Sequence, residues 1–182
     1  VLCLDADEVV SPGLAEEIRR LLAGDPERAG YRIPRKSRYL GRLLRHAWYP
    51  DLKPRLFLRD RVSWGEEHVH ESVRLDGSWG TLTAPLIHHS FASLEDHIRT
   101  LQRYTSLGAD ELVRSGRSFS LLRLLGSPLV LFLKQYLLKR GFLDGVPGLI
   151  ACVLSGVHEF VKYAKLYERR RGGGRGTVRG LE

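Results

Sequence analysis

Hydrophobic and polar positions at the start of the chain predict a buried strand, an acidic loop and a helix. Residues 1–4 are an apolar run that we expect to form a strand, and Asp5 follows at its carboxyl end. Ser11 and Pro12 are typical of a helix N-cap and first turn, and apolar residues then recur at helical spacing as far as Gly24. The acidic loop would therefore lie at the edge where open α/β sheets bind their ligands.

The middle of the chain carries short strand patterns and then a second capped helix. We predict strands over residues 55–59, 69–73 and 81–87. Ser93 has the character of a helix N-cap, and the helical spacing that follows it ends before Gly116. Strands mixed with helices in this way predict an α/β fold.

From residue 121 onward the chain is much more apolar. Residues 121–138 and 142–157 are apolar runs that charged residues, proline and glycine interrupt. A membrane-spanning helix needs about 20 largely uninterrupted apolar residues, so we expect neither run to span a bilayer. The pattern favours two amphipathic helices that pack together or lie in a membrane interface. An ordinary helical subdomain buried against the sheet is the alternative.

Composition agrees with one folded domain. The chain has 182 residues, of which 43% are hydrophobic and 27% are charged, which allows a core and argues against global disorder. Cys3 and Cys152 each stand alone in an apolar run, which indicates neither a disulfide framework nor a zinc site. The chain contains no Met and opens inside a predicted strand, so we expect that an N-terminal part of the fold precedes Val1.

Positive charge is concentrated at the end of the chain. The net charge is +8, and the segment 169–182 holds five arginines among glycines against one acidic residue, Glu182. We expect this Arg/Gly tail to be flexible. Binding to nucleic acid, attraction to anionic lipid heads and a solvated tail without function are all open readings. The chain shows no zinc-finger, helix-turn-helix or RNA-binding signature, so we expect no specific nucleic-acid partner.

Asp5 and Asp7 are the first candidates for chemistry. Their spacing in a loop lets both carboxylates face one site, and hard oxygen ligands suit Mg²⁺ or Mn²⁺. Such an ion can bridge a diphosphate and neutralise charge on a leaving group. Acidic pairs in loops also serve simply as turn or cap residues, so the pair alone indicates a metal site only weakly.

His70 and Glu71 could complete that site from a second segment. They could supply a metal ligand and a general base, provided that the strand ends or bulges so that both side chains reach the cleft. A core histidine beside a surface carboxylate is the alternative. Arg55 could pair with a phosphate group, and Trp48 and Tyr49 could stack on a sugar ring. Arginine is abundant in the chain, so any single arginine can equally belong to a solvated face.

Several motifs in order resemble the second half of inverting family 2 glycosyltransferases, closest to the bacterial lipopolysaccharide-core β-1,4-glucosyltransferase group. The similarity covers residues 1–168 and rests on segments 4–8, 48–50, 55–57, 69–71, 141–149 and 162–166. It implies a GT-A fold that lacks its nucleotide-binding N-terminal half. Residues 1–116 would be the C-terminal part of the catalytic domain, residues 117–168 a helical region that can contact a membrane, and residues 169–182 the tail.

The resemblance also implies roles for individual residues. Asp7 would be the direct metal ligand, with Asp5 nearer the ribose or the sugar and with His70 close to the metal and the diphosphate. Glu71 would be the base that deprotonates the acceptor hydroxyl for in-line attack with inversion. Arg55 would bind the donor.

The expected function is metal-dependent transfer of a hexose from a nucleotide-diphospho-sugar donor to a saccharide or glycolipid acceptor in cell-envelope polysaccharide or lipopolysaccharide-core synthesis. The donor would be a UDP-hexose, and the ion Mn²⁺ or Mg²⁺. The protein would lie in the cytoplasm at the inner face of the bacterial cytoplasmic membrane, and this polypeptide can be inactive alone.

Two other classes fit parts of the sequence. Asp5 and Asp7 after an apolar run also resemble the first motif of haloacid-dehalogenase-type phosphatases, but the Gly-Asp-x-x-x-Asp segment of that group is absent after Gly24 and Asp25. A basic module that binds membranes or nucleic acid without catalysis would account for the charge and the tail.

Overall fold

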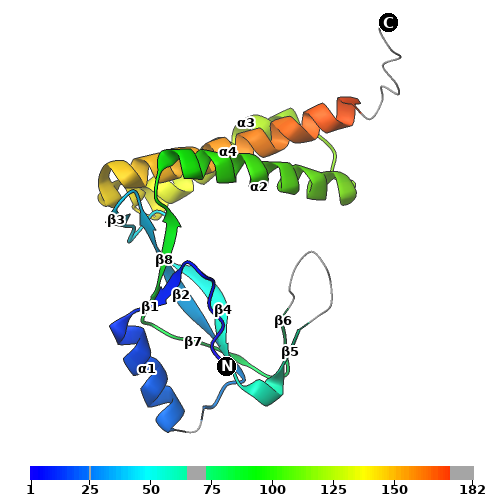
Figure 1. Cartoon of the computed structure of the whole chain (residues 1–182). Coiled ribbons are helices and arrows are strands. Elements are labelled where there is room, and N and C mark those ends of the chain that lie inside the picture. Colours follow the sequence, from blue (N-terminus) through cyan, green and yellow to red (C-terminus); the bar gives the residue numbers. More distant parts are fainter. Residues whose placement is uncertain (25, 65–72, 173–182) are drawn as a thin grey trace, which may run out of the picture. The chain divides into compact units, whose positions relative to one another are not determined.

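The computed structural model describes residues 1–24, 26–64 and 73–172. The chain divides into two compact units, Val1–Ser90 and Phe91–Glu182, and Figure 1 shows the elements of each. The first unit is a sheet with one helix, and the second consists of helices. We describe the two units separately.

The first unit is built on a mixed sheet whose long strand is β2 (Gly30–Tyr39). The strand order is β1-β8-β2-β3, with bounds Glu8–Val10 for β1, Leu86–Phe91 for β8 and Arg42–Leu43 for β3. Strand β2 also pairs antiparallel with β4 (Asp51–Phe57) and parallel with β7 (Trp79–Thr81). A short 3₁₀ turn, η1 (Arg59–Arg61), leads to a separate hairpin of β5 (Val62–Trp64) and β6 (Val73–Leu75). The mixed α/β class predicted from the sequence is therefore confirmed.

Helix α1 (Pro12–Ala23) supplies one side of the core of this unit. Its predicted cap is present, because the Ser11 hydroxyl accepts a hydrogen bond of 3.2 Å from the backbone N–H of Leu14. Leu14 is fully buried against apolar side chains of β2, β4, β8 and the loop after β7. The core residues are Leu14, Tyr31, Ile33, Leu56, Leu82 and Leu86.

The predicted N-terminal strand is only partly correct. Residues 1–4 run extended beside β4, with a single bridge between Leu2 and Leu56 and a hydrogen bond of 2.8 Å from Cys3 N–H to the Arg55 carbonyl. The first regular strand is β1, which begins at Glu8. A tight turn separates the two segments, because Glu8 N–H donates to the Asp5 carbonyl at 3.0 Å. The acidic residues therefore precede β1 and do not lie between a strand and α1.

Strand β2 and the division between β7 and β8 were not predicted. The sequence of β2 is rich in arginine and lysine, which disguises its alternation, yet Tyr31, Ile33 and Tyr39 are buried. The strand predicted over residues 81–87 is two strands, because the chain turns between Thr81 and Leu86. The predicted strand at residues 55–59 begins earlier, at Asp51.

The second unit packs three helices together. Helix α2 (Leu94–Arg114) contacts α4 (Gly145–Gly172), and α4 contacts α3 (Leu121–Leu133). A π-helical turn, η2 (Lys134–Leu138), and a 3₁₀ turn, η3 (Gly141–Asp144), join α3 to α4. The α2 cap is as predicted, with Ser93 accepting from Asp96 N–H at 3.0 Å. Helix α2 packs on α4 and belongs to the compact unit Phe91–Glu182.

Two helical segments are long and apolar enough to cross a membrane, by length and composition only. They are Leu121–Leu138 and Gly141–Gly172, each with a most apolar stretch of mean hydropathy 1.4. None of that stretch is buried in the first segment, whereas 33% of it is buried in the second. Length and composition alone therefore do not exclude spanning helices, because the mean hydropathy stays high despite isolated charges such as Arg123 and Lys134.

Candidate functional site

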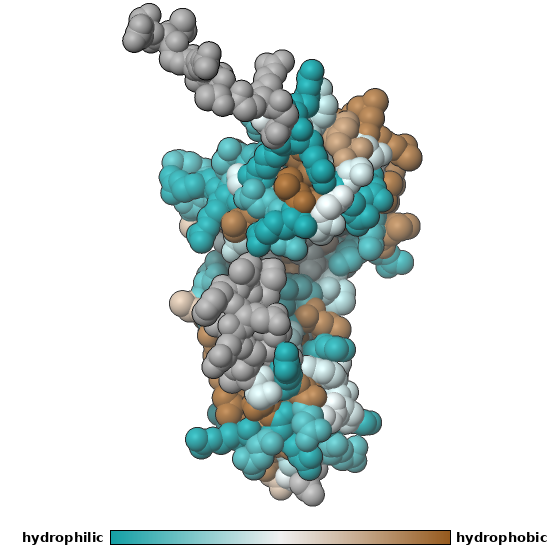
Figure 2. Space-filling view, turned by 90° about the vertical axis from the view of Figure 1, so that its right-hand side faces the viewer, coloured by the Kyte–Doolittle hydropathy of each residue, from teal (hydrophilic) through white to brown (hydrophobic). Residues whose placement is uncertain are grey.

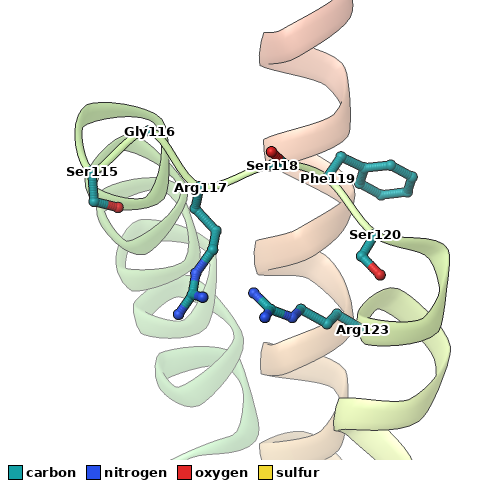
Figure 3. Close-up of a pocket in the computed structure, with 7 residues that line it drawn as sticks. All are labelled: Ser115, Gly116, Arg117, Ser118, Phe119, Ser120 and Arg123. Carbon is teal, nitrogen blue, oxygen red and sulfur yellow. The ribbon is translucent and has the colours of Figure 1, made fainter.

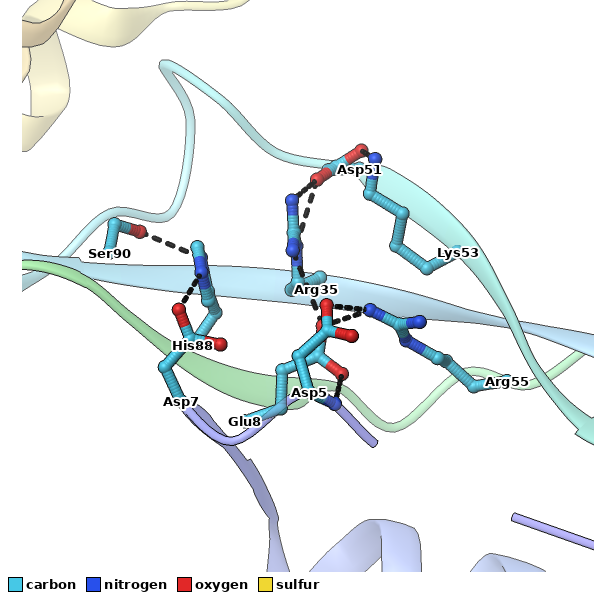
Figure 4. A network of polar contacts seen from close by, with 9 residues as sticks. All are labelled: Asp5, Asp7, Glu8, Arg35, Asp51, Lys53, Arg55, His88 and Ser90. Carbon is cyan, nitrogen blue, oxygen red and sulfur yellow. Dashed lines mark hydrogen bonds and ion pairs between the residues drawn. The ribbon is translucent and has the colours of Figure 1, made fainter. Parts of the chain in front are cut away.

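Strand pairing brings His88 to the acidic turn. Strands β1 and β8 are antiparallel with Glu8 opposite His88, and the backbone N–H of His89 donates to the Asp7 carbonyl at 2.9 Å. In this register the Nε2 atom of His88 lies 3.0 Å from a carboxylate oxygen of Asp7. The Nδ1 atom of the same ring lies 2.8 Å from the Ser90 hydroxyl. Figure 4 shows the His88 ring in contact with Ser90 through one nitrogen and with Asp7 through the other.

The His88 ring favours its neutral form. Desolvation by burial lowers its pKa below the ordinary 6.5, and the positive charge of Arg35 lowers it further. The Asp7 carboxylate acts in the opposite direction and does not reverse the shift. At neutral pH the ring therefore presents one nitrogen as an acceptor and the other as a donor.

Glu8 is the centre of a second group of charges beside this pair. Its side chain is fully buried, and one carboxylate oxygen lies 2.9 Å from an Arg55 nitrogen and 3.3 Å from an Arg35 nitrogen. The other oxygen accepts from the backbone N–H of Asp5 at 3.2 Å. Two guanidinium groups thus compensate a carboxylate that would be costly to bury alone.

The two arginines extend from Glu8 to further carboxylates. Arg55 pairs with Asp5, and Arg35 pairs with Asp51 at 2.7 Å. Burial alone would raise the pKa of Asp51, but hydrogen bonds and charge from Arg35 and Lys53 hold that pKa below its ordinary value. These contacts join the acidic turn to β2 and β4 (Figure 4).

Arg55 keeps one donor unused. Its Nε atom is buried and has no hydrogen-bond partner within the described part of the chain. Buried donors are normally satisfied, and an orphaned one at a polar cluster is consistent with a ligand position. The structure thus brings three of the predicted site residues together, namely Asp5, Asp7 and Arg55.

The predicted aromatic residues contact side chains of β2. The Trp48 ring meets the Tyr39 ring edge-on with centroids 5.1 Å apart, and the Lys36 ammonium lies 5.0 Å from the centroid of the Tyr49 ring. Their role as a platform for an acceptor sugar stays a prediction. His70 and Glu71, the predicted metal neighbour and base, lie outside the described residues.

A metal ion would find only part of its ligand set here. In the described ranges, no three His, Cys, Asp or Glu residues are placed to hold an ion together. Asp7 and His88 offer one carboxylate oxygen and one imidazole nitrogen. Mg²⁺ and similar ions commonly take one or two protein ligands and complete their shell with phosphate oxygens and water, so the pair fits an ion that arrives with a diphosphate.

Sequence reasoning assigned no role to four members of the site, namely Glu8, which belongs to the acidic cluster, and Arg35, His88 and Ser90. Their roles depend on contacts between strands that are distant in the sequence. One signal was available, namely the adjacent His88 and His89 at the end of an apolar segment. Neighbouring residues of a strand point to opposite faces, so one of the two histidines would face the sheet's ligand side.

Comparison with known proteins adds independent information. The chain is 28% identical over 173 residues to the lipopolysaccharide core biosynthesis glycosyltransferase LpsC of Rhizobium meliloti, covering 91% of this chain and 63% of that protein. Its relatives are glycosyltransferases. The uncharacterized glycosyltransferase RT0209 of Rickettsia typhi is 28% identical over 180 residues (92% of this chain, 62% of that protein). RP128 of Rickettsia prowazekii, with the same description, is 27% identical over 178 residues (91% and 61%).

The similarity to glycosyltransferases extends over nearly the whole chain, which nevertheless spans less than two thirds of the length of these relatives. No family model matches the chain. No solved structure matches it either.

Proposed function

We propose that this chain is the metal- and acceptor-binding part of an inverting family 2 glycosyltransferase with a GT-A fold. The reaction would transfer a hexose from a nucleotide-diphospho-sugar, such as a UDP-hexose, to a saccharide or glycolipid of the cell envelope. The observation that carries the proposal is the contact between Asp7 and His88 beside the Arg55 cluster, in a chain whose relatives are glycosyltransferases. Among those relatives, LpsC is named for lipopolysaccharide core biosynthesis.

Asp7 and His88 would hold Mn²⁺ or Mg²⁺. When bound, the ion would neutralise negative charge on the diphosphate leaving group. The Ser90 hydroxyl, 2.8 Å from Nδ1 of His88, orients the ring so that Nε2 faces Asp7. Such partners behind a ligand fix its tautomer and direction.

Arg55 would bind the diphosphate of the donor. Its guanidinium is held by Glu8 and Asp5, and its Nε donor has no hydrogen-bond partner within the described part of the chain. Guanidinium groups recognise phosphate oxygens through such directed donors. Asp5, which pairs with Arg55, would then lie toward the ribose or the sugar of the donor.

The acceptor hydroxyl would be deprotonated by Glu71, with His70 near the diphosphate. Attack by that hydroxyl from the face opposite the leaving group inverts the anomeric centre and requires no covalent enzyme intermediate. Trp48 and Tyr49 would support the acceptor sugar by stacking. We place the protein in the cytoplasm, at the inner face of the bacterial cytoplasmic membrane.

Sugar transfer by the complete gene product tests the proposal. The assay follows release of the nucleoside diphosphate from a panel of nucleotide sugars, with Mn²⁺ and envelope glycolipid. Glu71→Gln should lower turnover by about 10²-fold, the usual size of a general-base contribution, and leave donor binding nearly intact. His89→Gln is the control, because His89 is exposed and successive side chains of a strand alternate between its two faces, so His89 is on the face opposite His88. Unchanged turnover in Glu71→Gln would remove Glu71 from the role of base.

A further inference from the structure

The helical unit carries an exposed apolar surface on α3. Leu121, Leu125, Leu129 and Leu133 recur four residues apart, so they share one face of the helix. Leu122 on the same face is 82% exposed. The surface continues past the end of α3, where Leu138 is 80% exposed and Phe142 and Leu143 are also open to solvent. Contiguous apolar surface of this kind marks an interaction site.

The opposite side of the helical unit is polar. Helix α4 packs on α2 through Lys165, whose ammonium donates to Thr105 and Ser106 at 2.8 Å, and through Arg169, which pairs with Asp110 at 2.9 Å. On α2, the exposed Arg99 side chain pairs with Glu95 at 2.7 Å and with Asp96 at 3.7 Å. Figure 2 shows the same division, with brown side chains on one side of the helical unit and teal on the other. The unit is therefore suited to a boundary between water and an apolar phase.

An open basic pocket lies where the α2–α3 loop enters α3. Its volume is about 660 Å³, and residues 115–120 line it together with Arg123. Figure 3 shows the Arg123 side chain directed toward the side chain of Arg117. None of the described residues that line it is acidic, and neither arginine forms an ion pair within the described part of the chain. Two cations that line one pocket without an acidic neighbour among its lining residues favour an anionic ligand.

Further positive charge and aromatic rings lie at the same end of the unit. The Arg170 guanidinium donates to the Arg117 carbonyl at 2.9 Å, which brings the basic last turn of α4 to the pocket. The Phe119 and Tyr167 rings are in contact, with centroids 4.8 Å apart. Aromatic side chains between charged and apolar surfaces are typical of the interfacial layer of a membrane.

We propose that the Arg117–Arg123 pocket binds the phosphate of an anionic lipid head group, while the apolar face of α3 enters the acyl region of the same leaflet. The exposed residues Leu121 and Leu122 directly follow Ser120, which lines the pocket. A lipid could therefore place its phosphate in the pocket and its acyl chains against the leucines. A nucleic acid would neutralise the arginines and leave the leucines in water. This inference rests on the proposed membrane-surface location and is independent of the transfer reaction.

Co-sedimentation of the 182-residue chain with vesicles tests the pocket. The vesicles are phosphatidylcholine alone or an equal mixture with phosphatidylglycerol. We expect preference for the anionic vesicles, and a loss of about 30-fold in the variant that combines Arg117→Gln and Arg123→Gln, since each cation near an anionic surface contributes about 1 kcal/mol. The control combines Arg99→Gln and Arg103→Gln on the polar side, changes net charge equally and should bind nearly as the wild type does.

A second variant separates the apolar face from the pocket. Leu122→Ser combined with Leu125→Ser replaces exposed side chains, so it should fold normally by circular dichroism and bind both kinds of vesicle more weakly. If this variant loses binding while the Arg117/Arg123 variant does not, the membrane location stands and the pocket is overturned. Absence of wild-type binding to any vesicle would overturn the location and the pocket together, without touching the transfer proposal. Preferential binding to a single-stranded RNA, lost in the Arg117/Arg123 variant, would overturn the lipid assignment.

Discussion

His88 and Asp7 are 81 residues apart in sequence, yet the Nε2 atom of His88 lies 3.0 Å from a carboxylate oxygen of Asp7. The antiparallel register of β1 and β8 creates this contact by setting Glu8 opposite His88. The contact gives Asp7 of the acidic turn an imidazole partner from β8, and this partner does not depend on the position of His70. His88 thereby becomes the residue that connects the sheet to the proposed metal chemistry.

Arg55 should be important for folding as well as for donor binding. Arg55→Gln leaves the fully buried Glu8 carboxylate with Arg35 as its remaining guanidinium, at 3.3 Å. Because breaking a buried ion pair is costly, we expect the free energy of unfolding to fall by about 3 kcal/mol. Urea denaturation of the purified chain measures the change.

Arg61→Gln is the matched control for Arg55→Gln. Arg61 pairs with Asp76 at 3.3 Å, but both side chains are well exposed, so this change should cost about 0–1 kcal/mol. Equal losses for the two variants would mean that the pairs with Glu8 do not stabilise the first unit.

Two glycines of the helical unit should respond in opposite ways to alanine. A Cβ at Gly148 would lie 2.6 Å from the Asp144 Cβ and even closer to the Gly141 carbonyl oxygen. Gly148→Ala should therefore lower the free energy of unfolding by about 1–3 kcal/mol through overpacking of η3 against α4. Gly126 in α3 has open space around it, and Gly126→Ala should stabilise the chain by about 1 kcal/mol through helix propensity. Thermal unfolding of the Gly148→Ala and Gly126→Ala variants measures the two changes. Destabilisation by both substitutions would contradict the packing described for these glycines.

The helical unit should lose stability in mild acid because of His97. Burial lowers the pKa of His97 from 6.5 to about 4, and the neighbouring His158 contributes in the same direction. The unfolded chain therefore takes up a proton near pH 6.5 that the folded chain resists until about pH 4. The free energy of unfolding falls as the pH falls through that window, by on the order of 3 kcal/mol from this one group.

His97→Phe tests this pH dependence. The substitution keeps a ring stacked on Phe91, where the centroids are 4.2 Å apart, and removes the titrating group. Denaturation between pH 7 and pH 4 should show a shallower loss in this variant than in the wild type, whereas exposed His89→Gln should leave the slope unchanged. Parallel slopes for wild type and His97→Phe would contradict the assignment to His97.

Local signals in the sequence predicted the helices well. The Ser11 and Ser93 caps form as expected, because each hydroxyl bonds to a backbone N–H three residues ahead. The α/β class also follows from short-range patterns, and the expectation that Asp5, Asp7 and Arg55 share a site came from the order of motifs that resemble a known family. Such features require only residues that are close in sequence or shared with a known family.

Features that depend on long-range pairing were missed. Strand β2 carries Arg35 into a partly buried position, where its charge is compensated by Glu8 of β1 and Asp51 of β4. The contact of His88 with Asp7 depends on the register of two strands. Helix α2 looked like the end of the sheet domain, because its partners on α4, such as Arg169, come much later in the chain. The hydrophobic pattern within one segment cannot predict such contacts, because each of them joins residues from two distant segments.

Mn²⁺ binding by the complete gene product in the presence of a nucleoside diphosphate tests the central claim most directly. Electron paramagnetic resonance of the bound Mn²⁺ is the readout. Asp7→Asn should abolish the bound Mn²⁺ signal, and His88→Gln should weaken it strongly. His89→Gln, one residue away on the other face of β8, should bind as the wild type does. Wild-type binding by Asp7→Asn and His88→Gln would contradict the claim that this pair holds the ion of a glycosyltransferase.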